Sequence, residues 1–128
     1  MPKIGQRNTQ QRQAILDIIE EAPGPITVNE ILTIACKKGL QIGIATIYRT
    51  VKLLLESKVI SQVMLPDGQS RYETSCQADH HHHHLHCNKC GKVVDVHKCC
   101  EHLHESEVEG HIVERHEITL FGICKDCR

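Results

Sequence analysis

The chain has 128 residues, of which 40% are hydrophobic, so it is long enough for one domain or two small ones with a core of ordinary size. Lysine and arginine number 15 against 16 aspartate and glutamate residues, and the net charge of −1 argues neither for nor against a nucleic-acid partner. No apolar run approaches the roughly 20 residues that span a bilayer, and the first residues lack a signal-peptide core. We therefore expect a cytoplasmic protein with no membrane partner.

Cysteine and histidine are concentrated in the second part of the chain. All 11 histidines and seven of the 8 cysteines lie from Cys76 onward. Charge divides at the same place: residues 1–72 carry nine basic and six acidic side chains, whereas residues 73–128 carry six and ten. In the reducing cytoplasm, paired cysteines indicate metal ligands or redox groups before they indicate disulfides.

Two helices are predicted before residue 40. The first runs from Thr9, as its cap, through Glu21, and Pro23-Gly24-Pro25 stops it. Thr27-Val28-Asn29-Glu30 has the pattern of a capping box and opens a second helix that runs to Gly39.

A third helix is expected from about Ile44 to Ser57. Its apolar positions, which we expect to be buried, are Ile44, Ile47, Val51, Leu54 and Leu55, and its other side carries Thr46, Arg49, Thr50 and Lys52. Residues 59–65 and 69–73, joined by a turn at residues 66–68, predict a β-hairpin. Three helices and a hairpin are typical of a winged helix-turn-helix, whose third helix enters the DNA major groove. The alternative is a packing module in which the basic side chains are only a solvated helix face.

The remaining chain predicts a small α/β unit, so the fold class is α+β. We expect a strand at residues 92–96, a polar helix from about Cys99 to Glu109, and a strand or pair of strands between His111 and Cys124 in which Ile112, Ile118, Leu120 and Ile123 alternate with polar groups. A unit of at most 56 residues buries little apolar surface and usually needs a metal or a partner subunit.

Two C-x2-C pairs, separated by 33 residues, are the most specific signal in the sequence. Each presents two thiolates from one tight turn, and two such turns complete the tetrahedral shell that structural zinc prefers. A redox-active or disulfide pair is the alternative. The predicted zinc ligands are Cys87, Cys90, Cys124 and Cys127.

A second group of residues is suited to a labile, sensing metal. Candidates are Cys76, His82, His84 and Asp95; the two histidines alternate along an extended segment and so point the same way. His81 and His83 point to the other side, where His116 and a helix residue such as His102, Glu101 or Glu105 complete a possible third site. The alternative is a solvated histidine-rich loop that binds metal only adventitiously.

These motifs together resemble the Fur family of metal-dependent transcriptional repressors over nearly the whole chain. The resemblance rests on residues 43–51, on the histidine-rich stretch that leads into residues 87–95, and on residues 116–127. It implies a winged-helix DNA-binding domain at 1–75, a hinge with regulatory metal ligands at 76–84, and an α/β dimerisation domain with a four-cysteine zinc site at 85–128.

The resemblance also implies roles for individual residues. Tyr48 and Arg49 match DNA-contacting positions, and we place Thr46 and Lys52 on the same interface. His82 and His84 match the regulatory ligands. His81, His83 and His116 match a further site, in which His102 occupies the position of a glutamate.

The pattern is most similar to the zinc-uptake regulator (Zur) type. Cys76 matches the thiolate of zinc-responsive members, and Pro25 stands where iron and peroxide sensors usually have a metal-binding histidine. Gln62 stands where some zinc sensors supply an aspartate, so the fourth ligand is open between Asp95 and Glu73. Asp95 occupies the carboxylate position used in iron and peroxide members, and Cys99 and Cys100 match no known role.

We therefore expect a homodimeric repressor that binds a double-stranded DNA operator with Zn(II) as corepressor and controls metal-uptake genes. An iron- or peroxide-responsive regulator of the same family is the alternative. A metal-storage or metal-chaperone protein would explain the histidines but not the capped helices and hairpin. A zinc hydrolase would need an open metal site, and the sequence has no H-E-x-x-H helix.

Overall fold

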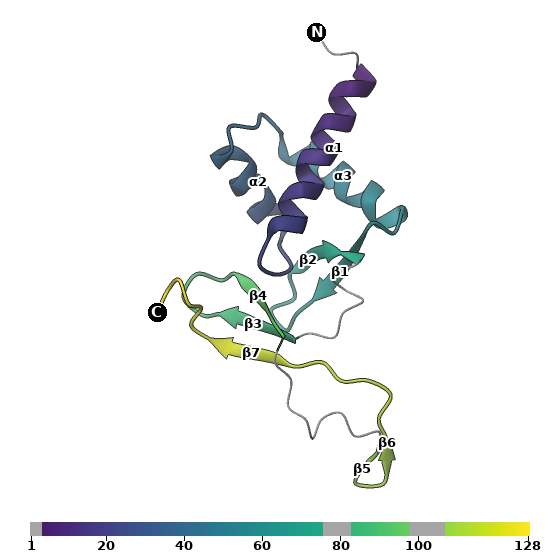
Figure 1. The fold of residues 1–128 in the computed structure, drawn as a ribbon, viewed down its shortest axis with the longest axis vertical. Helices are drawn as coiled ribbons and strands as arrows, with labels where there is room; N and C mark the ends of the chain where they lie inside the picture. The colour runs from purple at the N-terminus through teal and green to yellow at the C-terminus, as the bar shows by residue number, and fades with distance from the viewer. Residues whose placement is uncertain (1–3, 76–82, 98–106) are drawn as a thin grey trace. The chain divides into compact units, whose positions relative to one another are not determined.

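The computed structural model describes residues 4–75, 83–97 and 107–128, with side chains described from Thr9 onward. The chain divides into two compact units, residues 1–80 and 81–128, each of which is described by itself (Figure 1). The predicted α+β fold is confirmed. In the described part of the chain, no helix is both long and apolar enough to cross a membrane.

Helix α1 spans Ile4–Glu21 and therefore begins earlier than predicted. Thr9 lies inside the helix, so its prediction as the cap is wrong. No proline lies between Ile4 and Thr9, and Gln6 and Arg7 are good helix formers, so the helix extends back to Ile4. The predicted end at Glu21, before Pro23-Gly24-Pro25, is confirmed.

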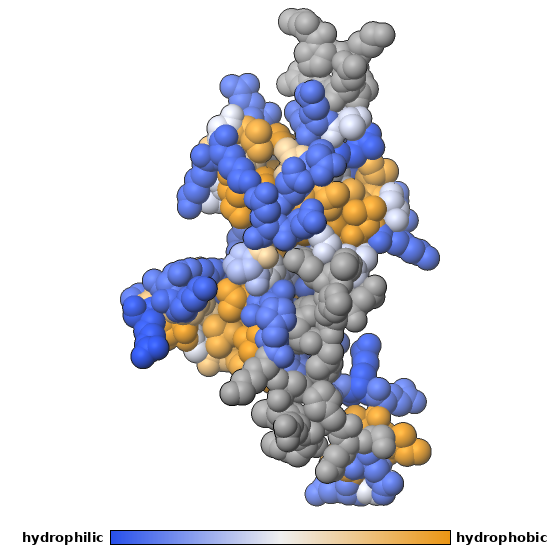
Figure 2. Space-filling model, in the orientation of Figure 1, coloured by the Kyte–Doolittle hydropathy of each residue, from blue (hydrophilic) through white to orange (hydrophobic). Residues whose placement is uncertain are grey.

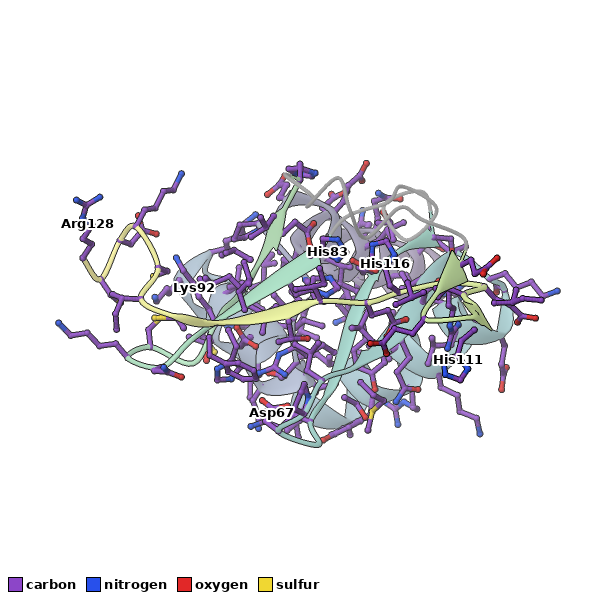
Figure 3. All side chains as sticks on the ribbon, turned by 90° about the horizontal axis from the view of Figure 1, so that it is seen from below. Asp67, His83, Lys92, His111, His116 and Arg128 are labelled. Carbon is purple, nitrogen blue, oxygen red and sulfur yellow. The ribbon has the colours of Figure 1, made fainter. Side chains whose placement is uncertain are left out.

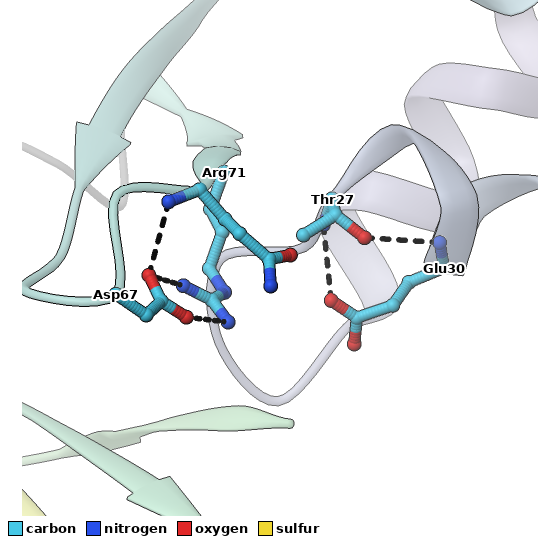
Figure 4. Close-up of polar contacts among 5 residues, drawn as sticks. Thr27, Glu30, Asp67 and Arg71 are labelled. Carbon is cyan, nitrogen blue, oxygen red and sulfur yellow. Dashed lines mark hydrogen bonds and ion pairs between the residues drawn. The ribbon is translucent and has the colours of Figure 1, made fainter. Parts of the chain in front are cut away.

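Helix α2 spans Val28–Lys37 and opens with the predicted capping box. The Glu30 backbone N–H donates to Thr27 Oγ1 at 3.1 Å, and the Thr27 N–H donates to Glu30 Oε1 at 3.1 Å (Figure 4). Both donors would otherwise be unsatisfied at the start of the helix. Gly39, with a φ of 76°, follows the C-cap Lys38 and turns the chain away.

Helix α3 spans Ile44–Glu56 and packs its apolar face on the core, with two corrections to the predicted face. Ile47, Val51 and Leu54 are buried as expected. Ile44, the first residue of the helix, is 42% exposed. Thr50 is 6% exposed, since it lies three residues after Ile47 and four before Leu54 and so shares their face.

The first unit has a continuous apolar core to which all three helices and the hairpin contribute. Its most completely buried side chains come mainly from isoleucine, which fills the interior with branched groups. They include Ile15, Ile18, Ile19, Ile31, Ile47 and Ile60. This unit therefore needs no metal to explain its packing.

The predicted hairpin is confirmed as antiparallel strands β1, Ile60–Met64, and β2, Ser70–Thr74. In the turn that joins them, Asp67 accepts from both Nη atoms of Arg71 at 2.9 and 2.8 Å and from the Gln69 backbone N–H at 3.1 Å (Figure 4). A two-residue bridge between Ile26 and Tyr72 joins the hairpin to the segment before α2. The hairpin thus belongs to the same packed unit as the helices.

The second unit contains a three-stranded sheet in the order β4-β3-β7. Strand β3, His83–Cys87, pairs antiparallel with β4, Val93–Val96, and parallel with β7, Thr119–Gly122. The strand predicted at residues 92–96 is confirmed. The carboxyl ends of β3 and β7 lie at the same edge of the sheet because these two strands are parallel.

A separate hairpin consists of β5, Glu107–Val108, and β6, His111–Ile112. Strand β6 of this hairpin and strand β7 are the pair of strands predicted between residues 111 and 124. Glu109 and Gly110 both have positive φ, 51° and 84°, as a two-residue type I′ turn requires. The predicted helix end at Glu109 is therefore wrong, and residues 99–106 of that prediction lie outside the described residues.

Removal of the α2 cap tests how much this helix contributes to the first unit. We expect Thr27→Ala to lower the free energy of unfolding by about 1 kcal/mol, because an N–H donor loses its partner at the start of the helix. Urea unfolding followed by the helical circular dichroism signal measures the change. Thr33→Ala, an exposed hydroxyl on the same helix, is the matched control. Equal midpoints for the two variants would contradict the role of the cap.

Candidate metal centre and nucleic-acid interface

The four predicted zinc ligands come together at one edge of the sheet. Cys87 is the last residue of β3, and Cys90 follows in a tight turn whose Gly91 has a φ of 79°. Cys124 and Cys127 occupy the equivalent turn after β7. The Asn88 N–H donates to the Gly122 carbonyl at 2.7 Å and holds the two strand ends together.

The separations between the sulfurs fit a zinc ion. The four Sγ atoms lie within 4.8 Å of one another, and those of Cys90 and Cys124 are 3.8 Å apart. Tetrahedral zinc with Zn–S bonds of about 2.3 Å requires S···S edges of about 3.8 Å. A disulfide would require about 2.05 Å. The donors and their spacing therefore favour structural zinc over the redox-active alternative.

Backbone donors prepare one of the four sulfurs to carry charge. The N–H groups of Cys124 and Cys90 donate to Cys87 Sγ at 3.3 and 3.4 Å. Both bonds lower the pKa of the Cys87 thiol, to about 5, and the bond from Cys124 has the larger effect. Hydrogen bonding to the sulfurs of Cys124 and Cys90 raises the pKa of the Cys127 thiol to about 12. Full ionisation of the cluster therefore requires a cation.

An ion pair that the sequence analysis did not identify connects the two cysteine turns. Lys92 Nζ lies 2.6 Å from Asp126 Oδ2, and the hydrogen bond between them raises the pKa of Lys92 and lowers that of Asp126. Lys92 follows the first C-x2-C pair, and Asp126 lies inside the second. Their positions in the sequence, next to the paired cysteines, could have marked them as neighbours of the metal site. Their contact with each other depends on the parallel pairing of β3 with β7.

Two of the predicted sensing residues face each other across neighbouring strands. His84 on β3 and Asp95 on β4 are register partners, and His84 Nε2 lies 3.4 Å from Asp95 Oδ1. Cys76 and His82 lie outside the described residues, so the predicted sensing set stays a prediction.

Two residues of the predicted third site also lie together. The rings of His83 and His116 have centroids 5.3 Å apart, and Figure 3 shows the two side chains next to each other. His83 Nδ1 accepts a hydrogen bond from the Ile118 N–H at 3.2 Å, which places the proton of a neutral ring on Nε2. Metal binding by His83 would therefore require this hydrogen bond or the proton to be displaced. His81 and His102 lie outside the described residues.

The predicted DNA-binding residues lie on α3. Tyr48 is 55% exposed, and Arg49 and Lys52 are exposed beside it. Thr46 is half-buried and accepts a hydrogen bond from Arg49 Nη2 at 3.2 Å. Pro25 is fully buried before α2, so neither its chemistry nor its position provides a metal ligand.

Comparison with protein families gives a match over residues 3–121 to the Ferric uptake regulator family. The ferric uptake regulation protein of Bacillus subtilis is 36% identical over 129 residues, covering 93% of this chain and 83% of the relative. The peroxide-responsive repressor PerR of Staphylococcus epidermidis is 30% identical over 98% of this chain and 84% of that protein.

Solved structures show the same fold. A zinc-bound manganese uptake regulator matches with a TM-score of 0.76 and 28% identity over 93% of this chain and 94% of the other. FurB of M. tuberculosis, a zinc uptake regulator, matches with a TM-score of 0.54 and 30% identity over 98% of both chains. The relatives thus include regulators named for different signals. The chain belongs to the ferric uptake regulator family, whose members are metal-responsive transcriptional regulators that bind DNA operators as dimers and are not enzymes.

Proposed function

We propose that this protein is a zinc-responsive repressor in which Zn(II) acts as corepressor for the control of metal-uptake genes. The observation that carries the proposal is the combination of a cysteine, Cys76, in the predicted sensing segment with a buried proline, Pro25, at the position where iron and peroxide sensors usually have a histidine. Thiolate and imidazole ligands together suit zinc. A thiolate beside Fe(II) would be prone to oxidation.

We assign two kinds of zinc site to the chain. The structural site consists of the four-cysteine cluster, which is closed and therefore suited to hold the second unit together. The regulatory site consists of Cys76, His82 and His84 with Asp95 or Glu73 as the fourth ligand. The 3.4 Å approach of Asp95 to His84 favours Asp95. Gln62 donates to Ser70 Oγ at 2.9 Å and is a poor zinc ligand.

A third site, formed by His81, His83, His102 and His116, is part of the same proposal. The adjacent rings of His83 and His116 support it. Because His83 already accepts a backbone hydrogen bond, we expect this site to bind metal more weakly than the cysteine cluster. Metal binding at this site would then change the DNA affinity of the regulator without determining its fold.

Exposed apolar residues on the second unit support a homodimer. Leu120, Phe121 and Ile123 are exposed on and beside β7, at the edge of the sheet that the structure describes. Val108 and Ile112 are exposed on the β5–β6 hairpin, and Figure 2 shows apolar surface there, at the lower right. A second copy would bury these side chains and protect the strand edge.

The proposed mechanism links the metal ligands to DNA affinity. In the apo dimer the DNA-binding domains would move freely, and Cys76, His82 and His84 would hold zinc between them and so fix the domains at the spacing of two operator half-sites. Tyr48, Arg49, Thr46 and Lys52 then contact DNA. A shift of this equilibrium from 1:99 to 99:1 needs roughly 5.5 kcal/mol of differential binding, which two sites per dimer would share.

A metal panel tests the identity of the corepressor. Electrophoretic shift assays on operator DNA with Zn(II), Fe(II), Mn(II) or Ni(II) should show the largest gain in affinity with Zn(II), because the regulatory set contains a thiolate. If Fe(II) or Mn(II) promotes binding and Zn(II) does not, the iron- or peroxide-responsive alternative replaces the zinc assignment. If no metal changes the affinity, the corepressor mechanism fails.

Two cysteine substitutions separate the two zinc roles. Cys76→Ser should abolish zinc-dependent DNA binding and leave a folded dimer, whereas Cys124→Ser should release structural zinc and unfold the second unit. Metal analysis, size-exclusion chromatography and shift assays measure these effects. Cys36→Ser, at an exposed cysteine on α2, is the control that should change nothing. An unfolded Cys76→Ser protein would contradict its regulatory assignment.

The ion pair between the cysteine turns should slow the loss of structural zinc. We expect Lys92→Gln to release zinc about two- to fivefold faster into excess chelator, because a partly exposed ion pair contributes only a modest stabilisation. Release is followed with a zinc-binding dye. Lys89→Gln, which removes an exposed lysine from the first cysteine turn, is the matched control. Identical rates for both variants would show that the ion pair has no such effect.

A further inference from the structure

A groove lies between α1 and α3 on the first unit. Its volume is about 300 Å³, and side chains of both helices line it: Gln11, Arg12, Thr46, Arg49, Thr50 and Leu53. Two of these side chains are guanidinium groups and none is acidic. Arg12 lies on α1. Neither the family resemblance nor the assigned DNA-binding residues place a DNA contact on this helix.

The charges of the groove favour an anion. Within the described residues, neither Arg12 nor Arg49 forms a salt bridge, so the two positive groups border the same space without a compensating carboxylate. Arg49 is held by its hydrogen bond to Thr46 Oγ1 at 3.2 Å and is therefore positioned before any ligand arrives. An oxyanion between two guanidinium groups would receive charge-assisted hydrogen bonds from both.

The position of the groove on α3 identifies which anion fits. At about 100° per residue, Arg49 lies at the boundary between the exposed face with Tyr48 and Lys52 and the flank that borders α1. A helix about 10–12 Å wide fills a major groove about 12 Å wide, so its flanks lie against the phosphate walls. The groove would face one of these walls.

We propose that Arg12 and Arg49 together clamp one phosphate of the DNA backbone, which makes α1 a second DNA-contacting helix. This inference rests on the proposed DNA binding through α3. The clamp holds the recognition helix in register on the duplex and reads no base, because a phosphate is the same at every sequence. Arg12 therefore contributes to affinity on any duplex and not to the choice of operator.

The salt dependence of DNA binding tests the clamp. Each phosphate contact contributes about 0.9 to the slope of log K against log salt concentration, so Arg12→Gln in both protomers should reduce the slope by up to about 2. Fluorescence anisotropy is measured with zinc-loaded full-length protein on two labelled duplexes, one selected by the wild-type protein from a random library and one scrambled. Arg12→Gln should weaken binding to both equally, so their affinity ratio stays constant.

Two further variants control for charge and fold. Lys37→Gln removes an exposed cation from α2 and should leave the slope unchanged, and Arg12→Lys should retain most of it. Thermal unfolding and zinc content of each variant establish that it is folded. Because Arg12 is exposed, we expect no loss of stability.

The outcomes distinguish the clamp from the function on which it rests. A wild-type slope in Arg12→Gln, or a slope lowered as much by Lys37→Gln, would overturn the clamp while the DNA-binding function stands. A loss confined to the selected duplex would also overturn it, since it would indicate a base contact. Failure of the wild-type protein to bind either duplex would overturn both proposals.

Discussion

The parallel pairing of β3 with β7 is the interaction on which the second unit depends. It places the ends of two strands, and with them two C-x2-C turns separated by 33 residues, at one edge of a sheet. Parallel neighbours distant in sequence are costly to bring together, because a long loop must close before any contact forms. Four thiols in so small a space also resist full ionisation, as the opposed pKa shifts of Cys87 and Cys127 show. A divalent cation offsets both costs, and structural zinc binding of this kind is coupled to folding.

The two units reach stability by different means. The first buries many branched apolar side chains and ties its hairpin to the helices through Ile26 and Tyr72. Among the described residues of the second unit, the buried apolar side chains are Cys87, Val93 and Cys124, of which two are zinc ligands in our assignment. Loss of metal would therefore affect the second unit directly, while the DNA-binding surface would keep its own local structure.

Local sequence patterns predicted the first unit well because local interactions form its elements. The capping box at Thr27 and Glu30 and the turn at residues 66–68 are each determined by residues a few positions apart. The errors concerned where a helix begins or ends and which face of a helix is buried. Thr9 lies within a helix that simply continues, Thr50 is buried by its neighbours on α3, and Glu109 turns with Gly110 in place of ending a helix.

For the candidate site, spacing predicted the cysteine cluster but could not predict its surroundings. The contact between Lys92 and Asp126 spans 34 positions and exists only because of strand order, as does the approach of His84 to Asp95. The groove at Arg12 likewise depends on how α1 crosses α3. Side chains that supply ligands were visible in the sequence; side chains that position or neutralise them required the fold.

The ion pair in the hairpin turn has a consequence for how DNA binding responds to salt. Asp67 and Arg71 are the charged residues of segment 60–72, and they neutralise each other with two hydrogen bonds. If the hairpin turn contacts DNA in the proposed complex, it brings no net charge, and contacts from its exposed Met64 or Pro66 would release no counterions. Ionic strength would then act on the helices alone, while hairpin contacts would persist at salt concentrations that weaken the rest of the interface.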